Sequence, residues 1–390
     1  MVVEGTTPQL SIQSVCGTRH LAEVCQELLQ EAAIGVDSES DGFYRYPERV
    51  CLVQLAAPGR CYLVDTLAID DMSPLGSMLA NRQIQKVLHS AENDIRALDR
   101  QWGYRLFNLY DTSIAAHFVG MNLLGLQAVL AEALGVELDK SKKLQRANWG
   151  LRPIAEELIA YAAKDVCHLL DLREALSEKV DALGRAEWVR EECQRLEDVR
   201  YQPPASPEVA YTFIKGSHLL NGRQQAVLRE LVVLRERVAL ERGMPPFQVL
   251  SHAALLAMAQ DPSADLTKIE GLDQGQGLGL RPRVKGALRR ALEGPPMPQQ
   301  NLFSPRQARP TPAQQELARR LRNWRNQTGK RLALDPALVW PASSLERLAR
   351  EPHTLEQEIH SPEVRQWQVK EFGPSLMKFI QPSWNRDDLP

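Results

Sequence analysis

The chain has 390 residues, 44% of them hydrophobic, which is enough for about two or three domains with apolar cores. Its formal charge is −2, but residues 1–200 carry a net charge of −9 and residues 201–390 a net charge of +7. We therefore expect nucleic-acid affinity mostly in the second half. Neither a secretory leader nor a long apolar run is visible, and the six cysteines form no C-x-x-C pair, which disfavours a membrane protein, a disulfide frame and a zinc knuckle. A reduced, cytoplasmic protein is expected.

The first candidate site residues lie on a strand. Residues 18–33 predict an amphipathic helix, and residues 34–40 a strand on which Asp37 and Glu39 share one face. Two buried acids on one face are costly unless a cation compensates them. The alternative is a strand end that faces solvent.

Two more strands, at residues 50–56 and 61–65, extend this strand into a hairpin or meander. The loop before them is rich in aromatic residues, with Phe43, Tyr44 and Tyr46 close to the acids. These rings either stack a terminal base of a nucleic acid or pack over the meander.

The next acid follows a short strand at residues 86–90. A helix is predicted from residue 91, so Asp94 lies in its first turn, and His89 lies at the end of the strand. Both are candidates for the same site. An aspartate in a first turn also often serves only as a helix cap.

The last candidates lie in a run of residues 153–180 with helical periodicity. Tyr161 and Asp165 are four residues apart and share a face, so Asp165 can bind a metal while Tyr161 points at a water on it. The alternative is a buried tyrosine beside a satisfied aspartate. Lys140 belongs to a basic cluster just before this run that can bind phosphates.

Taken together, Asp37, Glu39, Asp94 and Asp165 supply hard oxygen ligands from separate elements. Such ligands suit Mg²⁺ or Mn²⁺. Two such ions stabilise the attacking and leaving oxygens of a phosphoryl displacement. The set therefore predicts metal-dependent phosphodiester chemistry.

These motifs, in the order Asp-x-Glu, His-x-x-x-x-Asp and Tyr-x-x-x-Asp, resemble those of the DEDDy 3′–5′ exonucleases. Three flanking stretches are similar to the ribonuclease D family in particular: Leu138-Asp139-Lys140-Ser141, Trp149-x-x-Arg152-Pro153 and Tyr161-Ala162-Ala163-Lys164-Asp165-Val166. One departure is the aromatic stretch from Phe43 to Tyr46, which leaves the substrate contacts there open.

The resemblance implies an α/β RNase H-like exonuclease domain, a mixed sheet flanked by helices, over residues 1–200. It implies that Asp37, Glu39, Asp94 and Asp165 hold two divalent ions, Mg²⁺ or Mn²⁺, and that Tyr161 orients or helps to activate the attacking water. The expected reaction releases nucleoside 5′-monophosphates from the 3′ end of RNA such as tRNA precursors. Two alternatives stay open: a DNA-directed 3′–5′ exonuclease and a non-catalytic RNA-binding scaffold.

An internal repeat organises the second half. After a linker at residues 201–212, Gln224–Pro262 and Gln314–Pro352 align without gaps at an offset of 90 residues, with ten identities in 39 positions. The copies resemble HRDC domains, so two small all-α domains are expected at 213–293 and 313–390, joined by a proline-rich linker at 294–312. This resemblance implies nucleic-acid binding.

Basic clusters in the repeats fit that role. Arg319 and Arg325 belong to one of them and are candidate phosphate contacts, unless these are merely solvated helix faces. In the linker, residues 299–303 are similar to peptides that dock on bacterial sliding clamps. The alternative is that Leu302 and Phe303 fix the linker to a neighbouring domain. We expect a monomer that acts on RNA without membrane attachment.

Overall fold

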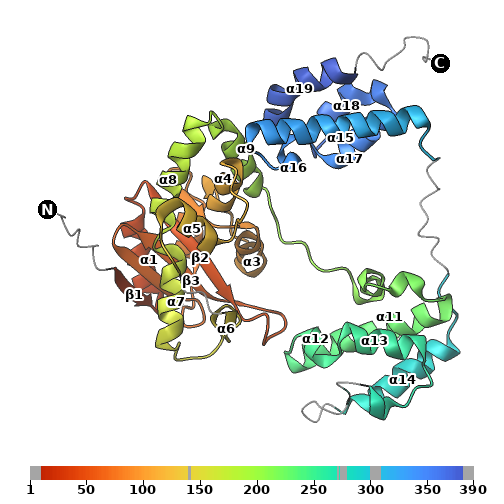
Figure 1. Cartoon of the computed structure of the whole chain (residues 1–390). Coiled ribbons are helices and arrows are strands. Elements are labelled where there is room, and N and C mark those ends of the chain that lie inside the picture. Colours follow the sequence, from red (N-terminus) through yellow and green to blue (C-terminus); the bar gives the residue numbers. More distant parts are fainter. Residues whose placement is uncertain (1–9, 139–141, 270–271, 273–278, 299–308, 381–390) are drawn as a thin grey trace.

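The computed structural model describes residues 10–138, 142–269, 272, 279–298 and 309–380. Within these residues, six strands form one mixed sheet (Figure 1). The strands are β1 (Ser11–Val15), β2 (Ala33–Ser40), β3 (Val50–Ala57), β4 (Arg60–Asp65), β5 (Gln85–Leu88) and β6 (Leu109–Asp111). Their spatial order is β1-β4-β3-β2-β5-β6. Strands β2, β3 and β4 form the predicted meander and pair antiparallel, whereas β1, β5 and β6 join their neighbours in parallel.

Helices cover both faces of this sheet. The first face packs on α1 (Thr18–Leu28), α2 (Ser73–Leu79) and α3 (Glu92–Trp102). The second packs on α4 (Thr112–Phe118), α5 (Leu126–Leu134), α7 (Glu156–Val166), α8 (Leu169–Ala182) and α9 (Ala186–Leu196), with α6 (Lys142–Gln145) before α7. Strand β3 is buried along its whole length because it is covered on both faces. The predicted mixed sheet flanked by helices is confirmed.

One edge of β2 becomes open halfway along the strand. Strand β5 pairs with β2 only from Ala33 to Gly35, where Gly35 faces Val87. The rest of β2, which carries the two acids, continues beyond β5 and is paired on the β3 side alone. This overhang leaves room beside the acids for the ends of neighbouring helices.

The helical run predicted at residues 153–180 is two helices. Helix α7 begins at Glu156, and α8 begins at Leu169 after a break at Cys167 and His168. The break has a packing reason: α7 lies across β2, β3 and β4, whereas α8 lies on β2 and β5 and against α4 and α5. The prediction of one continuous helix was wrong, but Tyr161 and Asp165 both lie on α7.

The two repeats have matching helices. Helices α11 (Gly222–Arg242), α12 (Pro246–Val249) and α13 (His252–Gln260) recur 90 residues later as α15 (Pro312–Leu332), α16 (Pro336–Val339) and α17 (Ala342–Arg350). The caps recur too, since Asn221 with Gln224 and Thr311 with Gln314 form capping boxes. The two glutamines donate to equivalent carbonyls, those of Gln260 and Arg350.

After this common part the copies diverge. The first copy ends with α14 (Leu280–Glu293), and the second with α18 (Leu355–Ile359) and α19 (Gln366–Ile380). Short elements complete the described helices: α10 (Pro207–Ala210) and the 3-10 helices Tyr211–Phe213, Ser217–Leu219, Leu266–Lys268 and Pro352–Thr354. The exact domain boundaries stay predictions.

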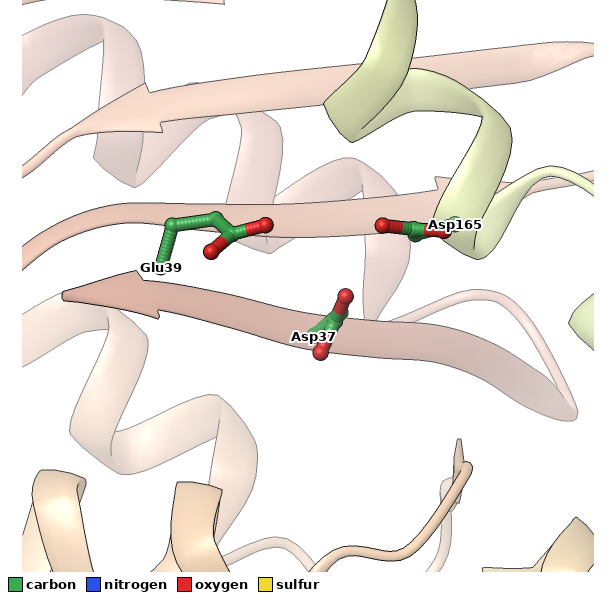
Figure 2. A group of neighbouring side chains, drawn as sticks. All are labelled: Asp37, Glu39 and Asp165. Carbon is green, nitrogen blue, oxygen red and sulfur yellow. The ribbon is translucent and has the colours of Figure 1, made fainter. Parts of the chain in front are cut away.

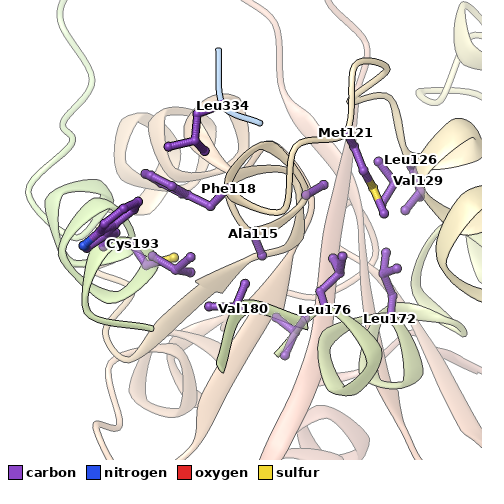
Figure 3. Packing of buried hydrophobic residues seen from close by; sticks show 14 of the residues in the cluster. Ala115, Phe118, Met121, Leu126, Val129, Leu172, Leu176, Val180, Cys193 and Leu334 are labelled. Carbon is purple, nitrogen blue, oxygen red and sulfur yellow. The ribbon is translucent and has the colours of Figure 1, made fainter. Parts of the chain in front are cut away.

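The two modules are attached differently. The first module (α10 to α14) has a hydrophobic core of its own, joined on its border by Tyr46 of the sheet domain. The second (α15 to α19) shares one continuous core with the sheet domain: Leu334 lies beside Phe118 of α4 (Figure 3), and Trp367 stacks on Trp188 of α9 at 4.7 Å. Arg185 joins the same interface by donating to Phe118 O and Leu332 O, each at 2.5 Å.

The longest described helices, α11 and α15, have 21 residues each and carry many charges. In the part of the chain that the structure describes, no helix combines the length and the apolar character needed to cross a membrane.

Candidate active site

Three carboxylates converge on the second face of the sheet. Asp37 and Glu39 project from β2, and Asp165 projects from the last turn of α7. One carboxylate oxygen from each lies within 4.8 Å of the other two, and the three groups point toward one another (Figure 2). Asp165 is buried and the other two are half-buried. Carboxylates this close repel one another unless a cation or a proton is shared between them.

A glycine makes this convergence possible. Gly35 lies on β2 two residues before Asp37, and a Cβ atom there would lie 3.1 Å from Val166 O and 3.4 Å from the Leu169 Cβ. Any larger residue would push the end of α7 away from the strand. On the helix, Ala162 and Ala163 are fully buried and allow the same close approach.

Tyr161 lies one turn before Asp165 on α7 and is 7% exposed. The four-residue spacing places its phenol on the same side of the helix as the Asp165 carboxylate. Burial raises the pKa of Tyr161 well above its ordinary value, and the charges of Asp165, Glu39 and Asp37 raise it further. The group therefore stays a neutral phenol and a hydrogen-bond donor. Its ring lies 6.2 Å from that of Trp149, which is buried beside it.

Asp94 does not belong to the group of three. It lies in the first turn of α3, where the Ser38 hydroxyl donates to Asp94 Oδ1 at 2.5 Å. Burial raises the pKa of Asp94 to about 6, against the opposing effect of its hydrogen bonds from Ser38. Asp94 lines a cavity of 430 Å³ together with Ser38, Ser40 and Arg100. That Asp94 is a metal ligand stays a prediction.

His89 follows β5 and is used within the fold. Its Nε2 lies 2.8 Å from the carbonyl oxygen of Leu124, to which it donates, and its Nδ1 lies 2.8 Å from Thr112 Oγ1. These bonds tie the end of β5 to α4 and to the segment before α5. The predicted substrate contact of His89 stays a prediction, and its hydrogen bonds favour a structural role.

The aromatic loop after β2 is closed at its base and exposed at its tip. Asp41 is buried and accepts hydrogen bonds from the Arg49 backbone at 2.7 Å and from its guanidinium at 2.9 Å. At the tip, Phe43 and Tyr44 are 49% and 45% exposed. The Tyr44 hydroxyl donates to Arg146 O at 2.8 Å, and the Arg146 guanidinium lies 5.8 Å from the Phe43 ring centre. Both rings are therefore accessible from solvent in the loop that follows Glu39.

The same loop holds the first helical module, which sequence reasoning missed. Tyr46 O–H donates to Glu236 Oε2 at 3.1 Å, and its backbone N–H donates to Gly243 O at 3.1 Å. Gln248 Nε2 donates to Phe43 O at 2.6 Å. The density of aromatic residues marked this loop as unusual, but nothing in the local pattern indicates a partner about 190 residues away.

The basic candidates of the second half lie at a groove. Arg319 and Arg325 line a cavity of 740 Å³ between α15 and α17. Arg319 pairs with Glu316 at 2.6 Å, and Arg325 Nε donates to Pro336 O at 2.7 Å. Lys140 and the clamp-like residues 299–303 lie outside the described residues.

A mixed sheet that carries Asp-x-Glu on a central strand, faced by a Tyr-x-x-x-Asp helix, defines a 3′–5′ exonuclease. In agreement, a family model described as 3′–5′ exonuclease matches residues 12–181, and a model of the HRDC domain matches residues 224–276. Ribonuclease D of Gluconacetobacter diazotrophicus is 31% identical over 370 residues, which are 92% of this chain and 90% of that protein. The chain belongs to the ribonuclease D family.

Solved structures of related exoribonucleases support this family assignment. The structure of Escherichia coli RNase D, described as an exoribonuclease involved in structured RNA processing, has a TM-score of 0.69 at 25% identity and covers 95% of this chain and 99% of that one. The catalytic core of RRP6 from Trypanosoma brucei has a TM-score of 0.66 at 28% identity, over 75% of this chain and 83% of that one. The protein is therefore a 3′–5′ exoribonuclease, and the scaffold alternative falls.

Proposed function

We propose that this exoribonuclease trims structured RNA, such as tRNA precursors, from the 3′ end and releases nucleoside 5′-monophosphates. Two divalent ions, Mg²⁺ or Mn²⁺, are held by Asp37, Glu39, Asp94 and Asp165. The observation that carries the proposal is the convergence of three carboxylates within 4.8 Å on one face of β2.

The donor set fits a hard divalent cation. Carboxylate oxygens are the ligands that Mg²⁺ and Mn²⁺ prefer, and three negative groups at this separation need positive charge between them. When bound, such ions supply a nucleophilic water at neutral pH and stabilise the charge on the reacting phosphate oxygens. The half-buried position of Asp37 and Glu39 leaves the site open to substrate on one side.

Tyr161 orients the attacking water in this proposal. The phenol oxygen of Tyr161 has lone pairs that can accept a hydrogen bond from a water molecule. A water held in this way presents its own lone pair to the phosphorus. The place of Tyr161 one turn before Asp165 on α7 suits it to position this water.

Substrate contacts come from two places. Phe43 and Tyr44 expose their rings a few residues after Glu39, where an unpaired 3′ base can stack on them. Arg319 and Arg325 line the groove of the second helical module, where their charges attract the phosphates further along the RNA. The description of the E. coli relative supports structured RNA as the substrate class.

The central experiment replaces Asp37 or Asp165 by asparagine and measures cleavage of a 5′-labelled RNA, RNA binding, and Mn²⁺ binding by calorimetry. We expect cleavage to be nearly abolished and Mn²⁺ binding to be weakened, with RNA binding largely kept. Asp171→Asn is the matched control, since this acid is exposed on α8. Loss of RNA binding with an unchanged cleavage rate would contradict the proposed ligand role.

Matched RNA and DNA oligonucleotides test the substrate class. We expect the RNA strand to be degraded faster from its 3′ end than a DNA strand of the same sequence. A strong preference for DNA would refute the RNA assignment and support the DNA-directed alternative.

We further propose that the protein is a cytoplasmic monomer. All six cysteines, from Cys16 to Cys193, are free thiols, as expected in a reducing compartment. Light scattering during gel filtration and fractionation of cells check the two statements. The clamp-like residues 299–303 are tested by a pull-down with purified sliding clamp.

A further inference from the structure

Ser38 lies between the two acids of β2 but serves a different carboxylate. Side chains alternate along a strand, so Ser38 faces α3 while Asp37 and Glu39 face α7. Its hydroxyl donates to Asp94 Oδ1 at 2.5 Å. The side chain of one β2 residue therefore donates a hydrogen bond to Asp94.

The open edge of β2 makes this arrangement possible. Pairing with β5 stops at Gly35, so no strand covers that edge of β2 at Ser38. The first turn of α3 occupies that place. Asp94 is half-buried here, and a carboxylate partly removed from water needs a hydrogen-bond donor, which the Ser38 hydroxyl supplies.

Helix α3 is fixed independently of this contact. Its residues Ile95 and Leu98 are buried in the core. Arg96 donates to Arg200 O at 2.5 Å, and Arg100 pairs with Glu48 at 2.5 Å. The helix backbone therefore stays in place when Ser38 changes, and the contact sets only the direction of the Asp94 side chain.

We propose that Ser38 is a positioning residue whose hydroxyl holds the Asp94 carboxylate at the edge of β2, beside Asp37 and Glu39. This inference rests on the proposed function, in which Asp94 is a ligand of one of the two ions. The cluster of Asp37, Glu39 and Asp165 does not include the Ser38 hydroxyl, so in this proposal it binds one ion without that hydroxyl. The hydroxyl matters for the other ion, because in this proposal Asp94 is a ligand of that ion and the hydroxyl orients Asp94.

The test is Ser38→Ala, measured by calorimetric titration of the full-length protein with Mn²⁺. We expect two Mn²⁺ sites in the unchanged protein. In the variant one site keeps its affinity and the other weakens by about 10- to 100-fold, the range for loss of a group that orients a ligand. The Mn²⁺ concentration for half-maximal cleavage rises by a similar factor.

Two variants serve as controls. Ser38→Thr keeps the hydroxyl and restores the weak site. Ser40→Ala removes a hydroxyl from the same cavity two residues further along β2 and leaves both sites unchanged. The unchanged affinity of the first site shows that the variants are folded.

Asp94→Asn separates this inference from the proposed function. If Asp94→Asn weakens the second site and Ser38→Ala does not, Ser38 has no positioning role and the proposed ligand set stands. If Asp94→Asn leaves both Mn²⁺ sites intact, Asp94 is not a ligand, and this inference fails together with that part of the proposed function. If Asp37→Asn also leaves Mn²⁺ binding intact, the metal site itself is wrong.

Discussion

Replacing Trp367 by alanine tests whether the C-terminal helical module and the nuclease sheet unfold as one unit. Trp367 lies in the first turn of α19 and is 3% exposed. Its ring stacks on Trp188 at 4.7 Å and meets the edge of Phe118 at 5.2 Å. Its indole N–H donates to Glu192 at 3.0 Å. The side chain therefore joins the module to two helices of the sheet domain.

The expected loss of unfolding free energy is about 3–5 kcal/mol, the usual cost of truncating a buried tryptophan. The lost hydrogen bond adds little, because Glu192 keeps its ion pair with Arg365 at 2.9 Å and is not left without a partner. A double-mutant cycle with Trp188→Ala should give a coupling of about 0.5–1.5 kcal/mol, the excess that stacked aromatic pairs show over their buried area.

Urea unfolding followed by circular dichroism and by tryptophan fluorescence measures both quantities. If the shared core holds, Trp367→Ala shifts the transition of the whole nuclease body. Lys370→Ala is the control on the same helix: it breaks an exposed pair with Glu187 and should change stability by less than about 1 kcal/mol. The reasoning is refuted if the module unfolds in a separate transition and only that transition moves.

Three further predictions follow from single residues. Tyr161→Phe should lower the cleavage rate by about 10²–10⁴-fold with RNA binding kept, as measured in single turnover, because the water loses its acceptor; an unchanged rate would remove Tyr161 from the mechanism. Ala333→Gly should raise the unfolding free energy by about 0.5–1 kcal/mol, because Ala333 ends α15 at φ 49°, where the first copy has Gly243; Gly243→Ala should do the opposite. Burial lowers the pKa of Lys86 to about 8 in the folded protein. Above that pH the unfolded chain binds more protons than the folded protein, so the contribution of Lys86 to the unfolding free energy rises with pH. Between pH 7 and pH 9 the unfolding free energy should rise by about 1 kcal/mol relative to Lys86→Met, and equal pH profiles would contradict the shift.

The parts of the site that follow from local periodicity could be predicted from sequence. Alternation along a strand places Asp37 and Glu39 on one face, and the four-residue spacing places Tyr161 and Asp165 on one side of a helix. Both regularities come from backbone geometry, so they are visible in the sequence. The 90-residue offset of the repeat is visible for a different reason, because identical residues recur at that spacing.

Contacts between distant segments could not be predicted. The bond from Tyr46 to Glu236 and the stacking of Trp367 on Trp188 join residues from different domains, and no local pattern records them. The break between α7 and α8 depends on which strands each helix covers, so the apolar spacing alone suggested a single helix. Asp94 was correctly placed in a first turn, but its bond to Ser38 depends on where β5 ends.

Because of the shared hydrophobic core, the sheet domain and the second helical module form one structural unit. The polypeptide leaves the nuclease body after α9, builds the first helical module, and then returns to complete that body with α15 to α19. The first module is thus an insertion into the nuclease body, although the sequence suggests three separate domains in a row. Deleting the first module and joining α9 to α15 by a short linker should therefore give a minimal folded nuclease. Deleting everything after α9 would instead expose the rings of Phe118 and Trp188 to solvent and give a fragment that aggregates.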